Sequence, residues 1–349
     1  MSQKQLAIHA GSHKTGSSAI QRYLYEHRDE LEQQGVHYLH RGNANSSLWM
    51  LRAFKRDLAQ LPAFSHLGLD EEGVLRLRTR ARKRLARLAG ASEAPLAVLS
   101  AEAIGAFAHE ELQELYDVTS AHYPRIVIHQ YFRPMKARME SAYQERLKHG
   151  FATLDQKFHL GYNRRVELLD GVFGRDNVNI YKYDGAVFPD GDVVKHFLGA
   201  LDIAPPGGIA TRAFNTGLSL PAVRLLYVYR KFNPDLMPGD RQIVKALARL
   251  QGDDFRFHSS LFDALLATGP NAVTLFERRA GFSITEDIQA DDNIGIATEQ
   301  ALTDISPESL LWLQQQVNKN GQGEAALPTC SDLEAIAALV GRLAGDQPG

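Results

Sequence analysis

The segment with the clearest chemical character is a short polar loop between two glycines. Gly11–Ser18 reads Gly-Ser-His-Lys-Thr-Gly-Ser-Ser and follows the apolar run Leu6–Ala10. After the loop, apolar residues recur with helical spacing at Ile20, Tyr23, Leu24 and Leu31. A strand, a glycine loop and a helix start together present unpaired backbone N–H groups at the positive end of a helix dipole. The segment therefore predicts a site for a phosphate or a similar anion; the alternative is an ordinary glycine turn.

The position of the lysine distinguishes this loop from the loop of ATP-hydrolysing proteins. In a Walker A loop, GxxxxGK[ST], the lysine directly follows the second glycine. Here Ser17 occupies that position, and Lys14 precedes Gly16. Two other classes stay open: a nucleotide-dependent kinase on a P-loop-like core, and a catalytically silent nucleotide-binding protein. The misplaced lysine, and the lack of an evident apolar run ending in Asp after the loop, count against the kinase.

The order of residues in the loop resembles that of a known family. His9–Gln21, HAGSHKTGSSAIQ, follows the HIGxPKTGTTxLQ pattern of bacterial, carbohydrate-type sulfotransferases, with His13 where proline is usual. These enzymes use 3′-phosphoadenosine 5′-phosphosulfate (PAPS) and release PAP. The resemblance implies that Lys14 contacts the bridging oxygen and the sulfonate. It also implies that the loop binds the 5′-phosphate through Ser12, Lys14, Thr15, Gly16, Ser17 and Ser18.

A second segment extends the resemblance. In the family, VRxPxxRxxSxY binds the 3′-phosphate of PAPS through an Arg at a strand end and a Ser eight residues later. Arg133 and Ser141 reproduce this spacing, and Tyr143 matches the aromatic residue that follows. A guanidinium fork and a hydroxyl suit a dianionic phosphate. Arg133 and Ser141 are therefore expected to bind the 3′-phosphate.

A base is needed because a hydroxyl acceptor must lose its proton as the sulfuryl group arrives. Glu102 follows the apolar run Leu96–Leu99, where family members carry a catalytic glutamate. The competing interpretation makes Glu102 an acid at a helix start capped by Ser100. His13 and His9 are rival bases. We expect His13 to serve the anion more than the acceptor, while His9 lies on a strand, where packing accounts for it.

Composition limits the class of protein. The chain has 349 residues, a formal net charge of −2 and one cysteine, Cys330. The charge gives no global basic field, so nucleic acid is not an expected partner. One cysteine excludes a disulfide framework and a cysteine zinc site, and a cytoplasmic location is expected. No signal peptide or membrane-spanning run is evident. No metal is expected, and the acceptor implied by the resemblance is a saccharide, a glycolipid or another small molecule.

Strands alternating with helices over the first two hundred residues predict an α/β fold. The expected architecture is P-loop-like, with three layers and a central parallel sheet flanked by helices. Predicted strands include Val36–Leu39, Leu96–Leu99, Ile126–Phe132 and Val178–Tyr181. We expect residues 1–205 to form the PAPS-binding core and residues 206–349 to form a mostly helical continuation that completes the acceptor pocket.

One helix is unusually basic. Glu71–Leu88 carries six arginines and one lysine among its leucines. The favoured interpretation is a solvated face whose cations pair with acids elsewhere. The alternative is a patch that attracts an anionic acceptor such as an acidic polysaccharide.

Overall fold

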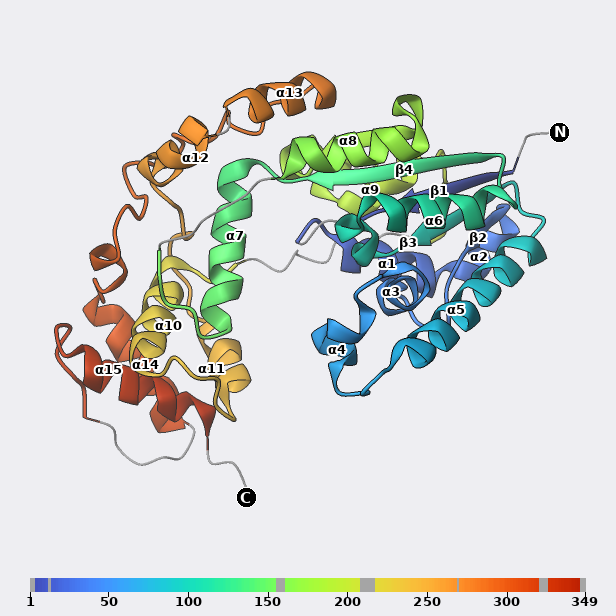
Figure 1. Ribbon diagram of the computed structural model, residues 1–349. Coiled ribbons are helices and arrows are strands. Elements are labelled where there is room, and N and C mark those ends of the chain that lie inside the picture. Colours follow the sequence, from blue (N-terminus) through green and yellow to red (C-terminus); the bar gives the residue numbers. More distant parts are fainter. Residues whose placement is uncertain are drawn as a thin grey trace. The chain divides into compact units, whose positions relative to one another are not determined.

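The computed structural model describes residues 4–11, 14–154, 161–207, 217–268, 270–319 and 326–345 (Figure 1). Contacts within the chain define two compact units, and neither is continuous in sequence. The first unit consists of Met1–Arg133, Gly161–Arg212 and Asn271–Ile284. The second consists of Pro134–Leu160, Ala213–Pro270 and Thr285–Gly349. The predicted functional division at residue 205 stays a prediction.

The first unit is built on a five-stranded sheet in the order β2-β3-β1-β4-β5, with every neighbouring pair parallel. This confirms the predicted α/β class with a central parallel sheet. β1 is the middle strand, so the loop that follows it opens at the centre of the carboxyl edge, where such sheets bind ligands. The strands are β1 (Gln5–His9), β2 (Val36–Tyr38), β3 (Leu96–Ser100), β4 (Arg125–Phe132) and β5 (Val178–Lys182).

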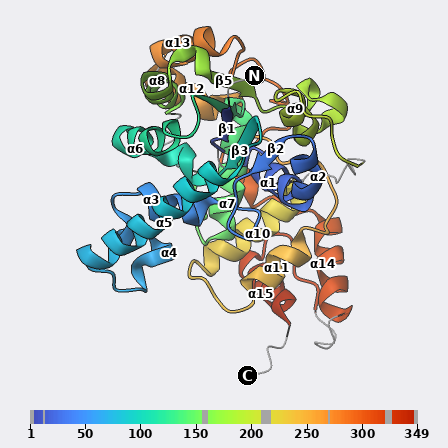
Figure 2. The ribbon, with the colours of Figure 1, turned by 90° about the vertical axis from the view of Figure 1, so that its right-hand side faces the viewer.

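Helices cover both faces of this sheet (Figure 2). Side chains alternate along a strand, so Leu6 and Ile8 of β1 pack on one face and Ala7 packs on the other. The Leu6 face is covered by α3 (Ser47–Phe54), α5 (Glu71–Ala91), α6 (His109–Ser120) and α8 (Tyr162–Phe173). The Ala7 face is covered by α1 (Ser17–Glu26), α2 (Arg28–Gln33) and α9 (Val193–Gly199). Burial on both faces explains why the strands are apolar runs.

One helix boundary differs from expectation. The helix predicted to continue through Leu31 is divided at His27, which ends α1 and precedes α2. Pro134 precedes the first helical residue of α7 (Met135–Lys148) and has an extended ψ of 149°. The other elements of the first unit are η1 (Leu58–Gln60), α4 (Pro62–Ser65), η2 (Glu102–Ala106), η3 (Arg175–Asn177), η4 (Gly185–Val187), η5 (Pro189–Gly191) and most of α13 (Pro270–Ala280).

The second unit is mostly helical, as predicted for the C-terminal part. It contains α7, α10 (Leu220–Phe232), α11 (Asp240–Leu247), α12 (Asp263–Thr268), α14 (Pro307–Lys319) and α15 (Leu333–Gly341). Its remaining short elements are η6 (Ser259–Phe262), η7 (Gln300–Leu302) and η8 (Arg342–Ala344).

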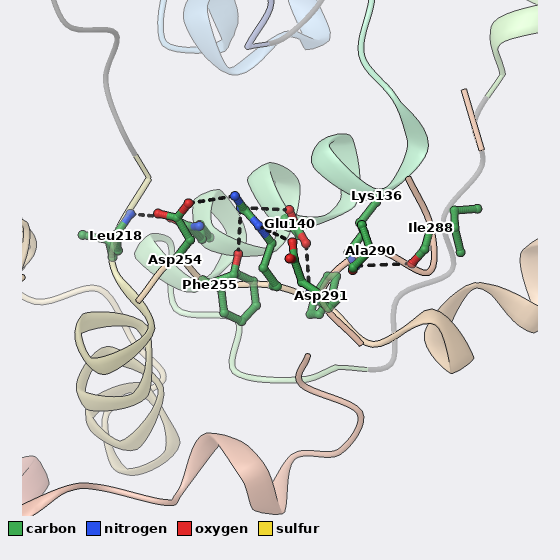
Figure 3. Close-up of polar contacts among 11 residues, drawn as sticks. Lys136, Glu140, Leu218, Asp254, Phe255, Ile288, Ala290 and Asp291 are labelled. Atoms are coloured by element: carbon green, nitrogen blue, oxygen red, sulfur yellow. Dashed lines mark hydrogen bonds and ion pairs between the residues drawn. The ribbon is translucent and has the colours of Figure 1, made fainter. Parts of the chain in front are cut away.

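A buried polar stripe on α7 holds three irregular segments of the second unit (Figure 3). Lys136, Glu140 and Gln144 recur every four residues, so they share one face of the helix. The Lys136 ammonium donates to the carbonyl of Ile288 at 3.3 Å. Glu140 accepts from the Phe257 N–H at 2.9 Å, and Gln144 accepts from the Leu218 N–H at 2.7 Å. Side chains of α7 therefore form hydrogen bonds with backbone groups in segments that lie outside the β-strands.

Candidate functional site

The loop after β1 has an unusual backbone. Lys14 is exposed and has a φ of 61°, in the left-handed region that side chains with a Cβ rarely adopt. Gly16 follows with a φ of 71° and immediately precedes α1. Thr15 is buried between them. The predicted loop residues Ser12 and His13 lie outside the described residues, so their roles stay predictions.

The two glycines allow other elements to approach the loop closely. A Cβ atom at Gly11 would lie 2.3 Å from Ser17 Oγ and 3.2 Å from the Cα atom of Glu102. A Cβ atom at Gly16 would lie 2.7 Å from Val193 Cγ1 and 3.2 Å from the Tyr183 ring. Real Cβ atoms are essentially never found within 3.0 Å of another heavy atom, so the contacts to Ser17 Oγ and Val193 Cγ1 exclude a side chain unless a neighbour shifts. The loop therefore lies between η2 on one side and the Tyr183 segment on the other.

The start of α1 has the properties of an anion site. Its first turn contains no acidic residue, and its N-cap residue, Gly16, has no side chain with which to cap the helix. The first N–H groups of a helix lack intrahelical partners and carry partial positive charge. Ser17 is 4% exposed, and its hydroxyl finds no hydrogen-bond partner in the described part of the chain. Ser18, by contrast, is exposed. A buried hydroxyl beside free N–H groups fits a phosphate oxygen.

Glu102 lies at the same edge of the sheet. It is the first residue of η2, directly after β3, and its side chain is partly exposed. The Ala101 N–H donates to the His9 carbonyl at 3.2 Å, which joins the ends of β3 and β1. A Cβ atom at Gly105 would lie 2.1 Å from the Gly11 carbonyl oxygen. The turn that carries Glu102 is thus in direct contact with the loop.

Arg165 of α8 fixes this turn from the other side. Its guanidinium donates to the carbonyl of Phe107 at 2.8 Å and to the carbonyl of Ile104. Burial lowers the pKa of Arg165 to about 10, so the side chain is still a cation at neutral pH. The sequence offered no signal for this contact, because Arg165 is distant in the chain and belongs to no recognised motif.

The structure separates Glu102 from the rival base His9. His9 is fully buried, and its Nδ1 lies 2.7 Å from the hydroxyl of Ser100. Burial, and next the neighbouring His129, lower the pKa of His9 to about 3. An imidazole that binds protons so weakly inside the core is a poor general base. Ser100 therefore pairs with His9. The competing interpretation, in which Ser100 caps the helix start, is wrong, because Ala101 occupies the cap position before η2.

Arg133 reaches the loop through an aromatic residue that the sequence did not single out. Its guanidinium lies over the ring of Tyr183, 5.4 Å from the ring centroid. The Tyr183 N–H donates to the Phe132 carbonyl at 2.7 Å, continuing the pairing of β5 with β4. Because the same ring lies against Gly16, Tyr183 connects Arg133 to the start of α1.

Ser141 lies on α7, in the second compact unit, and is partly exposed. Its joint action with Arg133 stays a prediction. Tyr143, which matches the motif aromatic, is buried and stacks on Phe255 with ring centroids 5.4 Å apart. Its ring is therefore part of the core of that unit.

The first unit therefore brings an exposed lysine, a helix start, a guanidinium and a carboxylate to one edge of the sheet. The positive groups suit an anionic donor, and the carboxylate suits removal of a proton from an acceptor. Within the described residues, no group of three or more His, Cys, Asp or Glu side chains is arranged to hold a metal ion. No helix in the described ranges is both long enough and apolar enough to cross a bilayer.

Comparisons with known proteins do not assign this chain to a family. No family model and no curated protein matches the chain. Among solved structures, the crystal structure of a sulfotransferase from Alicyclobacillus acidocaldarius is similar, with a TM-score of 0.40 and 15% sequence identity. The alignment covers 79% of this chain and 96% of that chain. Because a likeness this weak does not bear on activity, function must be inferred from the residues themselves.

Proposed function

We propose that this protein is a sulfotransferase that moves a sulfuryl group from PAPS to a hydroxyl or amine of an acceptor, a carbohydrate or glycolipid. The observation that supports the proposal most is the position of the Gly11–Gly16 loop. The loop contacts the turn of Glu102 on one side and the Tyr183 ring beneath Arg133 on the other. The start of α1, the candidate base Glu102 and the candidate phosphate-binding residue Arg133 thus lie in one unit, which supports the proposal.

In this proposal the start of α1 binds the 5′-phosphate through backbone N–H groups and the hydroxyls of Thr15, Ser17 and Ser18. Ser12 would contribute from the loop, and Arg133 and Ser141 would bind the 3′-phosphate. Lys14 is placed to stabilise the negative charge that develops as PAP leaves. Preorganised charge of this kind is often the largest catalytic contribution.

Glu102 is the proposed base toward the acceptor. As a bond forms between the acceptor oxygen and sulfur, the bond from sulfur to the phosphate oxygen breaks. The acceptor proton passes to the Glu102 carboxylate, and the bond electrons leave with PAP. His13 stays a candidate for contact with the transferred group.

The first test is the turnover of Lys14→Ala with PAPS, after acceptors have been found by mass-spectrometric screening of saccharides, lipids and small alcohols. We expect kcat to fall by about two to three orders of magnitude, because one preorganised charge is lost. Lys14 is exposed and alanine keeps the Cβ atom, so the melting temperature should be unchanged. Lys245→Ala, at an exposed lysine of α11, is the control. Near-full turnover of Lys14→Ala would exclude this role.

The second test measures nucleotide binding directly. Arg133→Ala should weaken PAP binding by about 10-fold or more in calorimetry, since a charge-assisted contact to phosphate is removed. An unchanged PAP affinity would remove Arg133 from the site. If the wild-type protein binds ATP more tightly than PAP, the kinase alternative is favoured instead. Tight PAP binding without transfer to any acceptor would favour a silent nucleotide-binding protein.

A further inference from the structure

The exposed face of α5 is a continuous row of cations. Arg80, Lys83, Arg84 and Arg87 follow the i, i+3, i+4 and i+7 spacing of one helix side, and all four are exposed. The opposite side of α5 packs on the core through Ala81, Leu85 and Ala89. From residue 76 to the end of the helix there is no acidic residue. α5 forms one flank of the first unit, beside α3 (Figure 1).

The other cations of this helix are already paired, which makes the contrast informative. Arg76 forms an ion pair with Glu72, and Arg82 forms one with Glu114. Arg78 donates to the carbonyl of Lys55 at 3.1 Å. For Arg80, Lys83, Arg84 and Arg87, no ion pair is recorded within the described ranges. The predicted pairing with acids therefore holds for one part of the helix and does not account for the exposed row.

Two cations from neighbouring segments extend the row. Arg41 is exposed on the loop after β2, and Arg52 of α3 lies over the ring of Phe64. Burial, followed by repulsion from Arg84 and then Arg52, lowers the pKa of Arg41. Arg84 and Arg52 therefore both lie within electrostatic reach of Arg41. Like charges held together at a surface favour an anionic ligand. We call Arg41, Arg52, Arg80, Lys83, Arg84 and Arg87 the basic face.

The basic face is continuous with the proposed catalytic edge. The Ala103 N–H, next to Glu102, donates to Ser47 Oγ at the first residue of α3. Arg52 lies five residues further along α3, about 7.5 Å at the rise of an α-helix. α5 then lies alongside α3, joined by a hydrogen bond of 3.1 Å from Trp49 to the Ala81 carbonyl. Adding a typical helix spacing, the path from Glu102 to the α5 cations is on the order of 15–20 Å.

We infer that the basic face binds the negatively charged chain of an acidic oligosaccharide acceptor while one of its hydroxyls reaches Glu102. The position of the acceptor hydroxyl at Glu102 rests on the proposed function. Binding of the negatively charged chain to the basic face does not. A single sugar ring is too short to reach both places, so the acceptor is an oligomer. Proteins that bind single-stranded nucleic acid stack its bases on aromatic side chains. The large apolar side chains described as exposed between residues 40 and 91 include no aromatic ring, so nucleic acid is disfavoured as the ligand.

The test uses a fluorescent polyuronate decasaccharide and the full-length protein without PAPS. Arg80→Glu/Arg84→Glu should weaken binding at least 10-fold in anisotropy titrations, and wild-type binding should weaken steeply as salt is raised. Arg241→Glu/Lys245→Glu, an exposed i, i+4 pair on α11, is the matched control and should change affinity less than 2-fold. Melting temperatures should be unchanged, because all four side chains are exposed.

Several outcomes would overturn the inference. One is equal binding of the decasaccharide by both double variants, and another is equal binding of a neutral dextran oligomer. Tighter binding of RNA or of phosphatidylserine vesicles that depends on Arg80 and Arg84 would assign the face to another partner. PAP calorimetry on Arg80→Glu/Arg84→Glu, expected to be unchanged, separates the two proposals. If PAP fails to bind but decasaccharide binding still depends on Arg80 and Arg84, the proposed function fails and the basic face stands.

Discussion

Two residues on neighbouring strand ends, Glu102 and His9, compete for the role of base, and their surroundings distinguish them. Glu102 is partly exposed on a turn that contacts the loop. His9 packs against Phe197, with ring centroids 5.2 Å apart, and has no path to an acceptor in its fully buried position. The ordinary pKa of histidine suits proton transfer near neutral pH. Burial lowers the pKa of His9 to about 3, which makes His9 a poor base and agrees with the expectation that packing accounts for it.

Glu102→Gln tests this assignment. The amide keeps the size of the side chain but cannot take a proton, so kcat should fall by about 10²–10⁴-fold while PAP affinity stays within 2-fold. Turnover and PAP calorimetry on the same preparations provide the measurement. Glu110→Gln, at an exposed acid in the first turn of α6, should leave both values unchanged. Full activity in Glu102→Gln would return the role of base to His13.

At the level of single residues, the sequence indicated candidate positions but not their conformation. Lys14, Ser17 and Arg133 were singled out from their spacing, and the structure places all three in the first unit. The left-handed backbone of Lys14 was not predictable, because no glycine or asparagine marks that position. Tyr183 and Arg165 were missed as site residues because their importance comes from contacts between segments distant in the chain.

Among the elements, the contact between the loop and η2 leaves very little room for an added side-chain atom. The Gly11 carbonyl and the Gly105 Cα pass so closely that a Cβ atom at Gly105 would lie 2.1 Å from the oxygen. The obstacle is backbone, so no side-chain rotation can relieve it. Any side chain at residue 105 must therefore push the turn of Glu102 away from the anion loop.

Gly105→Ala should consequently weaken PAP binding and turnover together, and should lower the free energy of unfolding by about 1–3 kcal/mol, as overpacking does. Gly171→Ala is a matched control within α8, since a Cβ atom there meets nothing within 4 Å. That control should keep activity and gain about 0.5–1 kcal/mol, because alanine favours the helix. Calorimetric PAP binding and urea unfolding measure both effects. Equal behaviour of the two variants would mean that the turn adapts without moving Glu102.

Elements with strong local patterns were predicted well. β3, β4, β5 and α7 follow apolar runs or stripes that depend only on neighbouring residues. The break between α1 and α2 was missed because His27 carries no glycine or proline signal. The order of the strands was not predicted at all. Strand order depends on pairing between distant segments, which the periodicity of one segment does not encode.

For the whole molecule, the compact units combine segments that are distant in the sequence. Most of α13 belongs to the first unit, although it lies far along the chain. Arg279 on α13 forms an ion pair of 2.7 Å with Asp170 on α8, and Phe276 packs on Phe132 with ring centroids 4.9 Å apart. The sequence did not predict that α13 packs in the first unit, because no local motif indicates it.

Three buried groups in the two units, His9, His129 and Glu140, predict responses of opposite sign to pH above about 4.5. In the first unit, burial lowers the pKa of His9 to about 3 and that of His129 to about 4. In the second, burial raises the pKa of Glu140 to about 7, although the Phe257 N–H and Arg256 oppose the shift. The histidines bind protons more readily in the unfolded chain, whereas Glu140 binds its proton more readily in the folded chain.

We therefore expect acid to destabilise the first unit and rising pH to destabilise the second. As pH falls from about 6.5 toward 4, each histidine should remove about 1.4 kcal/mol of unfolding free energy per pH unit. As pH rises from about 4.5 through 7, Glu140 should act with the same slope and the opposite sign. Pulse proteolysis in urea, with mass-spectrometric identification of the peptides released from each unit, measures both responses.

Two substitutions assign these slopes to their side chains. His129→Gln keeps a polar partner for the Tyr181 hydroxyl, which lies 3.0 Å from His129 Nδ1, and should flatten the acid response of the first unit by about one proton. Glu140→Gln keeps an acceptor for the Phe257 N–H and should flatten the response of the second unit at higher pH. Arg256 retains ion pairs with Asp254 at 2.7 Å and with Asp291 at 3.3 Å, so it stays paired after this change. If neither substitution changes a slope, the pH dependence arises from other groups. If a substitution in one unit changes the slope of the other unit, the two units do not unfold separately.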